Sequence, residues 1–238
     1  WAFLLMNFTA FSQKNDSINK LELIEITAFR KTIPQIEATT SVAKINSNIL
    51  QINNPERILE AVNLIPGSKI EERSPGSYRV SLRGSTLRSP FGVKNVKIYW
   101  DDFILTDATG NSYLNLLPPS FISNITVLKG PQGSEIGSET GGALLLNTNK
   151  AEHLSLDFSG GSYNQFSQNL NFAKQLGNHF LQIGQSHYQT DSYREQAAVN
   201  RGSFFLKDIW TYNPTNELKF QLLYTDLHYQ TPGGLTLQ

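Results

Sequence analysis

Apolar and polar side chains alternate with a period of two through most of residues 151–238. The run HLSLDFSG places Leu154, Leu156 and Phe158 on one face of an extended chain. Four more runs of this kind follow, at NQFSQNLNFAKQL, HFLQIGQSHYQT, RGSFFLKDIWTY and ELKFQLLYTDLHYQ. Because successive side chains of a strand point to opposite sides, the pattern predicts five β-strands. The expected connections are a turn at Gly177-Asn178, a polar loop over residues 191–200 and a turn over residues 213–216.

The polar face of these predicted strands is built from neutral side chains. In the second run, Phe166, Leu170 and Phe172 share one face, and the opposite face carries Gln165, Ser167, Asn169 and Asn171. Strands of a transmembrane barrel are apolar toward lipid and polar toward the lumen. Lipid offers no hydrogen-bond partner, so such strands must close into a ring, and five are fewer than the known minimum of about eight. The pattern favours part of a membrane barrel, with further strands expected beyond Gln238; a soluble all-β domain is the alternative.

Residues 1–150 have a different pattern, which predicts a small α+β domain. Asn54 and Pro55 are expected to begin a helix, with Asn54 as its N-cap, and Pro66-Gly67 is expected to end it. The runs YRVSLRG and VKIYW alternate, and ITVL and ALLL are short and mainly apolar, so each predicts a short strand.

Composition changes at the same boundary. Residues 1–150 hold 12 aromatic side chains and the shorter segment 151–238 holds 14, which indicates that the two parts face different surroundings. The formal net charge of zero gives no overall field to recruit nucleic acid, so no nucleic-acid partner is expected. The absence of cysteine excludes disulfides and thiolate chemistry. The four histidines lack metal-site spacing and are interpreted as polar lumen or interface residues.

The glycine-rich stretch TVLKGPQGSEIGSETGGALLLNT spans residues 126–148. A phosphate-binding P-loop needs a lysine directly after its last glycine, and no lysine follows a glycine here. A dinucleotide fingerprint needs a long amphipathic helix, but only a short apolar run follows Gly142. The stretch therefore predicts a strand, a tight turn and a returning strand. Gly133 and Gly137 would allow positive φ, and Gly141-Gly142 would allow close backbone approach.

The first residues, WAFLLMNFTAFSQKNDS, are apolar and contain a small-x-small pattern at Ala10-Phe11-Ser12. This pattern predicts the end of a secretory signal peptide, with cleavage before Gln13; a buried N-terminal strand is the alternative. No run of about 18 apolar residues follows, so no transmembrane helix is predicted. Both ends of the chain are expected to be cut from a longer protein.

The motifs, in their order, resemble the plug domain of TonB-dependent outer-membrane receptors. ILEAVNLIPG resembles the early plug helix, VSLRG the strand that ends in arginine and glycine, and VKIYWDDFIL the strand before the family's Asp-Gly turn. ITVLKGP, the glycine-rich turn and GGALLLNT resemble the family's plug signature. The resemblance covers about residues 21–150. Its signature positions in this chain are Gly84, Lys129, Gly130, Pro131, Gly133, Gly137, Gly141 and Gly142.

The resemblance implies a fold class and a division of the chain. The fold is an α+β plug domain followed by the first antiparallel strands of a transmembrane β-barrel, which in such transporters has 22 strands around a plugged lumen. Residues 1–12 would be a signal-peptide remnant and residues 13–34 an N-terminal extension. The plug would occupy residues 35–150, and residues 151–238 would form the first strands of an incomplete barrel.

The segment LIEITAFR resembles the energy-coupling segment of the family, called the TonB box. The residues expected to couple to TonB are Ile24, Glu25, Ile26, Thr27 and Ala28. The segment is short and extended-prone, so it could stay disordered until the periplasmic partner TonB pairs with it by strand addition. The alternative is an ordinary first strand of the plug.

The chain also departs from the family pattern. Two glutamates of the family signature are Ser123 and Thr126 here, so anchoring of the plug through charge pairs with the barrel is in doubt. The aromatic residue often found before the glycine at 137 is Ile136. The Asp-Gly turn is Asp102-Phe103, so positive φ is less expected there.

The resemblance implies active import and no enzymatic activity. The partners expected are TonB with its inner-membrane complex, a small-molecule metal chelate and outer-membrane lipid of a Gram-negative bacterium. No cofactor is expected, because the iron would travel within the chelate. Loops after Gly84 and Asp102 should reach the external side, which makes Arg83, Arg88, Phe91 and Tyr113 the ligand-contact candidates. For Arg83, an ion pair between plug and barrel is an equal alternative, and Arg88 could be a solvated loop charge.

A ferric siderophore or similar iron chelate is the leading ligand class. A cobalamin or other organometallic importer remains open, whereas the glycan branch is disfavoured because that branch usually carries an extra domain before the plug. From a different class, the chain could be a secreted β-rich binding module.

Overall fold

The computed structural model describes residues 25–28, 31–34, 41–47, 49–50, 58–74, 77–85, 93, 95–107, 111–131 and 141–232. The chain divides into two compact units, Trp1–Glu37 and Ala38–Gln238. In the first unit, β1 (Glu25–Ala28) pairs antiparallel with β2 (Lys31–Pro34), with Ile26 opposite Ile33. Four of the five proposed coupling residues therefore lie in a paired strand, whereas the sequence suggested an unpaired segment.

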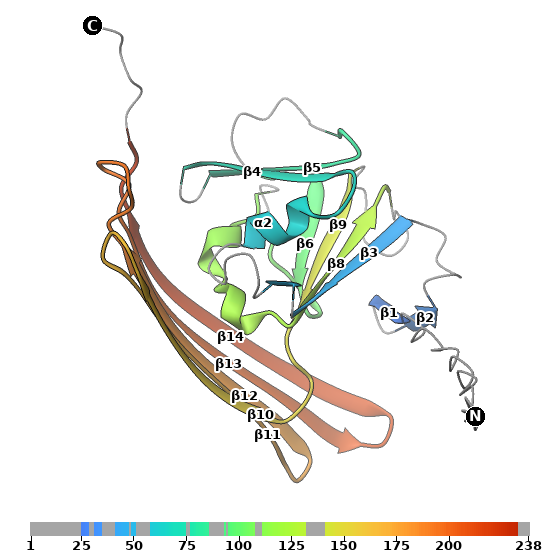
Figure 1. Cartoon of the computed structure of the whole chain (residues 1–238). Helices are drawn as coiled ribbons and strands as arrows, with labels where there is room; N and C mark the ends of the chain where they lie inside the picture. Colours follow the sequence, from blue (N-terminus) through green and yellow to red (C-terminus); the bar gives the residue numbers. More distant parts are fainter. Residues whose placement is uncertain are drawn as a thin grey trace, which may run out of the picture. The chain divides into compact units, whose positions relative to one another are not determined.

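In the second unit, a five-stranded mixed sheet has the strand order β3-β8-β9-β6-β7 (Figure 1). Its strands are β3 (Ser41–Asn46), β6 (Val96–Trp100), β7 (Phe103–Ile104), β8 (Asn124–Lys129) and β9 (Gly142–Asn147). Among the described strands, β6 and β9 are the one parallel pair. The strands β6, β8 and β9 are almost wholly buried, which explains why ALLL, and ITVL apart from its one threonine, are apolar rather than alternating.

The described residues of this part also form a helix, a hairpin and two short 3₁₀ turns. The helix α2 (Ile58–Asn63) ends just before Pro66-Gly67, as predicted, and Gly67 has a φ of 76°. The predicted N-cap, Asn54, lies outside the described residues. The hairpin pairs β4 (Ser68–Ser74) with β5 (Ser77–Leu82), and the 3₁₀ turns are η2 (Leu114–Leu116) and η3 (Pro119–Phe121). Ala61, Val62 and Ile65 join the strands in one hydrophobic core.

The five predicted strands after residue 150 form one antiparallel sheet in sequence order, here called the long-strand sheet (Figure 1). Its members are β10 (His153–Gly161), β11 (Gln165–Leu176), β12 (His179–Thr190), β13 (Val199–Asn213) and β14 (Asn216–Tyr229). The turns at Gly177-Asn178 and after Asn213 are confirmed. The polar loop is shorter than predicted, because Val199 and Asn200 already pair with β12.

The two faces of the long-strand sheet differ as the alternation predicted. The outer face carries exposed apolar side chains, among them Leu154, with 71% of its surface exposed, and Phe158, with 62%. The inner face carries buried polar side chains, among them Ser167, Asn169 and Ser186. Ser186 Oγ donates to Asn169 Oδ1 at 2.7 Å, so neighbouring inner-face groups satisfy one another. No helix among the described residues is long and apolar enough to cross a membrane.

Candidate functional site between the mixed sheet and the long-strand sheet

A buried ion pair joins the two sheets. Asp101 lies in the turn after β6 and Lys207 lies on the inner face of β13, with Oδ2 and Nζ 2.7 Å apart. The Asp101 and Lys207 side chains are 7% and 4% exposed. Asp101 has a φ of 52°. The positive φ of this turn therefore lies at the residue before Asp102-Phe103, the pair that corresponds to the family's Asp-Gly turn. Asp and Asn tolerate this conformation better than most residues.

Thr148 and Gln182 extend the ion pair into a network. The Thr148 amide donates to Asp101 Oδ1 and its hydroxyl to Asp101 Oδ2, both at 2.9 Å. Lys207 Nζ also lies 3.0 Å from Thr148 Oγ1, and Gln182 on β12 contacts Thr148 Oγ1 and donates to the Asn149 carbonyl. All these groups have partners, as a buried ion pair requires to offset desolvation. The network fixes the segment that leads from β9 into β10 against β12 and β13.

A second ion pair between the sheets is more exposed. Lys219 on β14 contacts Asp102 Oδ2 and also lies 2.8 Å from Glu217 Oε1. The Lys219 side chain is 28% exposed and that of Asp102 is 49% exposed. Because water screens such pairs, this contact is expected to contribute at most about 1 kcal/mol.

These pairs correct the expectation drawn from the missing glutamates. Ser123 and Thr126 are not part of a charge pair: Ser123 Oγ donates to the Asn147 carbonyl at 3.0 Å, and Thr126 is buried in β8. The mixed sheet is nevertheless anchored by charge, with the carboxylates of Asp101 and Asp102 on its side and lysines on the long strands. The sequence drew attention to Asp102 as part of a turn, but it predicted neither of these ion pairs. The available signal was a lysine on a polar face that has few charges, as in SFFLKDIW.

Aromatic packing lies beside the ion pair. The Phe205 ring centroid lies 4.7 Å from that of Trp100 and 5.5 Å from that of Phe121. Gly184 on β12 lies under Phe121, since a Cβ added there would be 2.6 Å from Phe121 Cε1. A glycine in the strand thus makes room for the η3 aromatic ring.

Gly184→Ala is therefore expected to destabilise the contact between η3 and the long strands by about 1–3 kcal/mol, since the methyl group must displace the Phe121 ring. The measurement is the urea concentration at which protease sites in the mixed sheet become cleavable in the purified protein. Gly202→Ala is the matched control on β13, because a Cβ there has no atom within 4 Å. Equal midpoints for the two variants would contradict the expectation.

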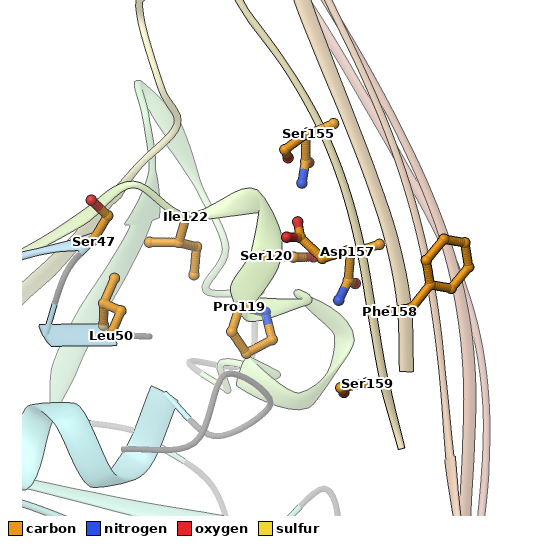
Figure 2. Close-up of a pocket in the computed structure, with 11 residues that line it drawn as sticks. Ser47, Leu50, Pro119, Ser120, Ile122, Ser155, Asp157, Phe158 and Ser159 are labelled. Atoms are coloured by element: carbon orange, nitrogen blue, oxygen red, sulfur yellow. The ribbon is translucent and has the colours of Figure 1, made fainter. Parts of the chain in front are cut away.

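A polar pocket of about 330 Å³ lies between η3 and the first two long strands. Figure 2 shows Ser120 and Asp157 on its two sides, with the Phe158 ring turned to the opposite face of the strand. Its walls are Ser47, Leu50, Pro119, Ser120, Ile122, Ser155, Asp157, Phe158, Ser159, Asn169 and Asn171. Among the described residues, no group of three His, Cys, Asp or Glu side chains is arranged to hold a metal ion.

The proposed ligand-contact residues are not brought together by the described structure. Arg83 is exposed with a φ of 52°, and its amide donates to the Gly67 carbonyl at 2.7 Å. Among the described residues, no ion pair joins Arg83 to a long strand. No contact therefore supports either interpretation of Arg83, as a ligand-binding residue or as a partner in an ion pair with the barrel. Tyr113 is exposed at the start of η2. Arg88 and Phe91 lie outside the described residues.

Four of the plug signature residues lie where β8 ends and β9 begins: Lys129, Gly130, Gly141 and Gly142. Lys129 Nζ donates to the Pro66 carbonyl at 2.6 Å, and the Gly130 amide donates to the Gly141 carbonyl at 3.1 Å. A Cβ on Gly142 would lie 2.0 Å from the Leu128 carbonyl oxygen, which agrees with the close backbone approach expected there. Gly84 lies in a turn with a φ of 74°, and Pro131 follows Gly130 just after the end of β8. Gly133, Gly137 and the coupling residue Ile24 lie outside the described residues.

The architecture defines a protein class: a compact α+β domain attached to the polar inner face of a curved antiparallel sheet whose outer face is apolar. Residues 34–144 match the family model described as the TonB-dependent Receptor Plug Domain. This match assigns residues 34–144, a little under half of the chain, to the plug domain of TonB-dependent receptors.

Solved structures show the same fold. The pyoverdine outer membrane receptor FpvA of Pseudomonas aeruginosa PAO1 matches at a TM-score of 0.69 and 18% identity, over 84% of this chain and 29% of FpvA. The ferric yersiniabactin uptake receptor FyuA of Yersinia pestis matches at 0.64 and 16%, over 78% and 31%. The copper transporter OprC matches at 0.64 and 18%, over 79% and 32%. The chain thus spans about a third of the length of these receptors.

Proposed function

We propose that this chain is the plug and early barrel of an active importer for a ferric siderophore or a similar metal chelate. The observation that carries the proposal is the joining of a folded plug to the polar inner face of strands whose outer face is apolar. Such a plug closes the lumen at rest, so passage of a ligand requires work on the plug. The metal is carried within the chelate. The residues of the chain bind the chelate, close the lumen and move when the chelate passes.

Ligand chemistry is the open part of the proposal. One of the similar structures is described as bound to pyoverdine, a second as a ferric yersiniabactin uptake receptor and a third as a copper transporter. A deletion strain should therefore be grown with single defined sources of ferric siderophore, copper or cobalamin. We expect loss of growth on one or more ferric siderophores and recovery with the intact gene. A defect confined to copper or cobalamin would overturn the assignment to iron.

Energy coupling is proposed to run through Glu25–Ala28 and the adjoining Ile24. TonB would pair with this segment by strand addition, which uses backbone N–H and C=O groups. In the hairpin, β1 has one edge paired with β2 and the other edge without a partner among the described strands. A two-stranded hairpin is marginally stable alone, so β1 remains available to a partner strand.

Ile26→Pro is expected to abolish uptake while ligand binding stays unchanged, because proline removes a backbone donor and fixes φ in the coupling strand. The measurements are uptake of labelled ferric siderophore by cells and equilibrium binding to isolated outer membranes. Ile33→Pro, on the opposing strand, is the matched control: it also breaks the hairpin but leaves the coupling strand intact, so uptake should persist. Loss of binding together with uptake in Ile26→Pro would count against the assignment.

A further inference from the structure

Polar side chains interrupt the apolar outer face of the long-strand sheet near one end of its strands. They are Lys174 on β11, His179 on β12 and Asp208 on β13. Lys174 is the register partner of Leu181, and Leu181 is the partner of Asp208, so these residues form one row across the sheet. Two strand spacings separate the backbones at Lys174 and Asp208 by about 10 Å. The row therefore carries a cation at one side and an anion at the other.

This end of the strands is the periplasmic end. The connections here are the short turns between β11 and β12 and between β13 and β14. The opposite end carries the longer loop 191–198. Outer-membrane barrels have short periplasmic turns and longer external loops. The leaflet that meets the periplasmic end is composed of phospholipids, whose headgroups lie at the level of the strand ends.

The carboxylate of Asp208 has an incomplete set of hydrogen-bond donors. Its Oδ2 atom lies 2.9 Å from His179 Nδ1, and the Asp208 and His179 side chains are 30% and 47% exposed. Its Oδ1 atom is shielded from solvent and accepts no hydrogen bond within the described part of the chain. An ionised group beside lipid is costly unless it is paired. A further donor that approaches from the bilayer would therefore be stabilised at Asp208.

Aromatic rings lie next to this carboxylate. The Trp210 ring stacks on His179, with ring centroids 5.6 Å apart and an angle of 6° between the planes. Tyr212 lies beside Trp210 at 5.7 Å between centroids, and both aromatic side chains are exposed. Trp and Tyr favour the membrane interface, and the face of a Trp ring attracts a cation. Ring and carboxylate thus favour positive charge, whereas the exposed Lys174 favours negative charge.

We propose that Lys174, His179, Asp208 and Trp210 form a site for the headgroup of a zwitterionic phospholipid. The phosphate lies at Lys174, and the ammonium group lies at Asp208 and Trp210. The flexible lysine side chain and the headgroup together bridge the distance between the two ends of the row. An anionic phospholipid without an ammonium group would bring no cation to the Asp208 carboxylate. The inference rests on the proposed function only in placing this face of the sheet against lipid.

Lipid binding to the purified intact receptor tests the site. The receptor is freed of bound lipid, and native mass spectrometry measures its affinity for phosphatidylethanolamine and for phosphatidylglycerol with identical acyl chains. The variants are Lys174→Gln and Asp208→Asn. Asp226→Asn is the matched control, because Asp226 also lies on the outer face beside a histidine, with Oδ1 3.6 Å from His228 Nδ1, but near the opposite end of the strands. Heat-modifiable migration on gels checks that each variant is folded.

We expect the wild type to bind phosphatidylethanolamine about 5–10-fold more tightly than phosphatidylglycerol, the size of effect that ammonium contacts with a carboxylate and an aromatic ring produce. Asp208→Asn should reduce this ratio to about one, and Lys174→Gln should weaken the binding of both lipids about 3-fold. Asp226→Asn should change neither affinity.

Equal affinities of the wild type for the two lipids, or a preference for phosphatidylglycerol, would overturn the proposal. A preference for phosphatidylethanolamine that survives Asp208→Asn would overturn the position of the ammonium group, and unchanged binding in Lys174→Gln would overturn the position of the phosphate. Uptake is not measured, so failure of the proposed import would leave this result unaffected.

Discussion

Lys207→Met is expected to lower the free energy of unfolding of the plug, packed on the long-strand sheet, by about 3–5 kcal/mol. The reason is that the substitution leaves the Asp101 carboxylate buried without its cation. The 2.7 Å contact is almost completely shielded from solvent, so water cannot replace the lysine. Thr148 would still donate two hydrogen bonds to Asp101, but they do not neutralise the charge. The measurement is the urea midpoint for exposure of plug protease sites in the purified receptor.

Two further variants separate burial from charge. Lys219→Met removes the exposed ion pair between Asp102 and Lys219. It should lower the free energy of unfolding of the plug by no more than about 1 kcal/mol. Asp101→Asn combined with Lys207→Met removes both charges and should recover much of the loss, since no unpaired buried charge remains. If Lys207→Met and Lys219→Met shifted the midpoint equally, burial would not be the source of the strength of the Asp101–Lys207 contact.

Gly142→Ala is expected to prevent the plug from folding, and is the second large effect. The new methyl group would lie 2.0 Å from the Leu128 carbonyl oxygen and 3.0 Å from the Gly130 amide nitrogen. Both are backbone atoms of β8 and its end, so no side-chain rotation relieves the overlap. Gly142 also has a φ of 123°, which costs a residue with a side chain about 1–3 kcal/mol by itself.

The measurement for Gly142→Ala is the amount of receptor in the outer membrane and the protease resistance of its plug. We expect a strongly reduced amount and cleavage within the plug under conditions that leave the wild type intact. Gly84→Ala is the comparison, because Gly84 has a φ of 74° but no atom within 4 Å of an added Cβ. Gly84→Ala introduces only the cost of the positive φ, so its effect should be much smaller. A normal amount of protease-resistant Gly142→Ala receptor would contradict the steric argument.

The strands of the long-strand sheet could be predicted from the sequence because each has a period-two pattern and a clear turn after it. The outer-face residues Leu154, Leu156 and Phe158 are exposed together, and the inner-face residues Ser167 and Asn169 are buried together. In the plug, β8 and β9 were found by their apolar runs. Their arrangement was not, because the parallel pairing of β6 with β9 joins segments that are distant in sequence.

The site was predicted less well than the fold. The glycines of the β8–β9 connection were identified through the family resemblance, and the close approach at Gly142 agrees with its steric role. Asp101, Thr148, Gln182 and Lys207 were not identified, and the charged anchoring was doubted for lack of two glutamates. The pairing of Glu25–Ala28 with β2 was also not expected, because a four-residue strand has no signal for its partner.

The sequence by itself determined which side of each long strand is apolar and where the backbone must come close, because both depend on residue type at fixed local spacing. Only the tertiary structure decided which charges meet. Asp101 and Lys207 are 106 residues apart, and no local sequence feature of either residue identifies the other as its partner. The same holds for the pocket wall, where Ser120 and Asp157 face each other only after β10 is placed against η3. Local patterns fix faces and turns, whereas contacts between distant segments depend on the packing of the whole chain.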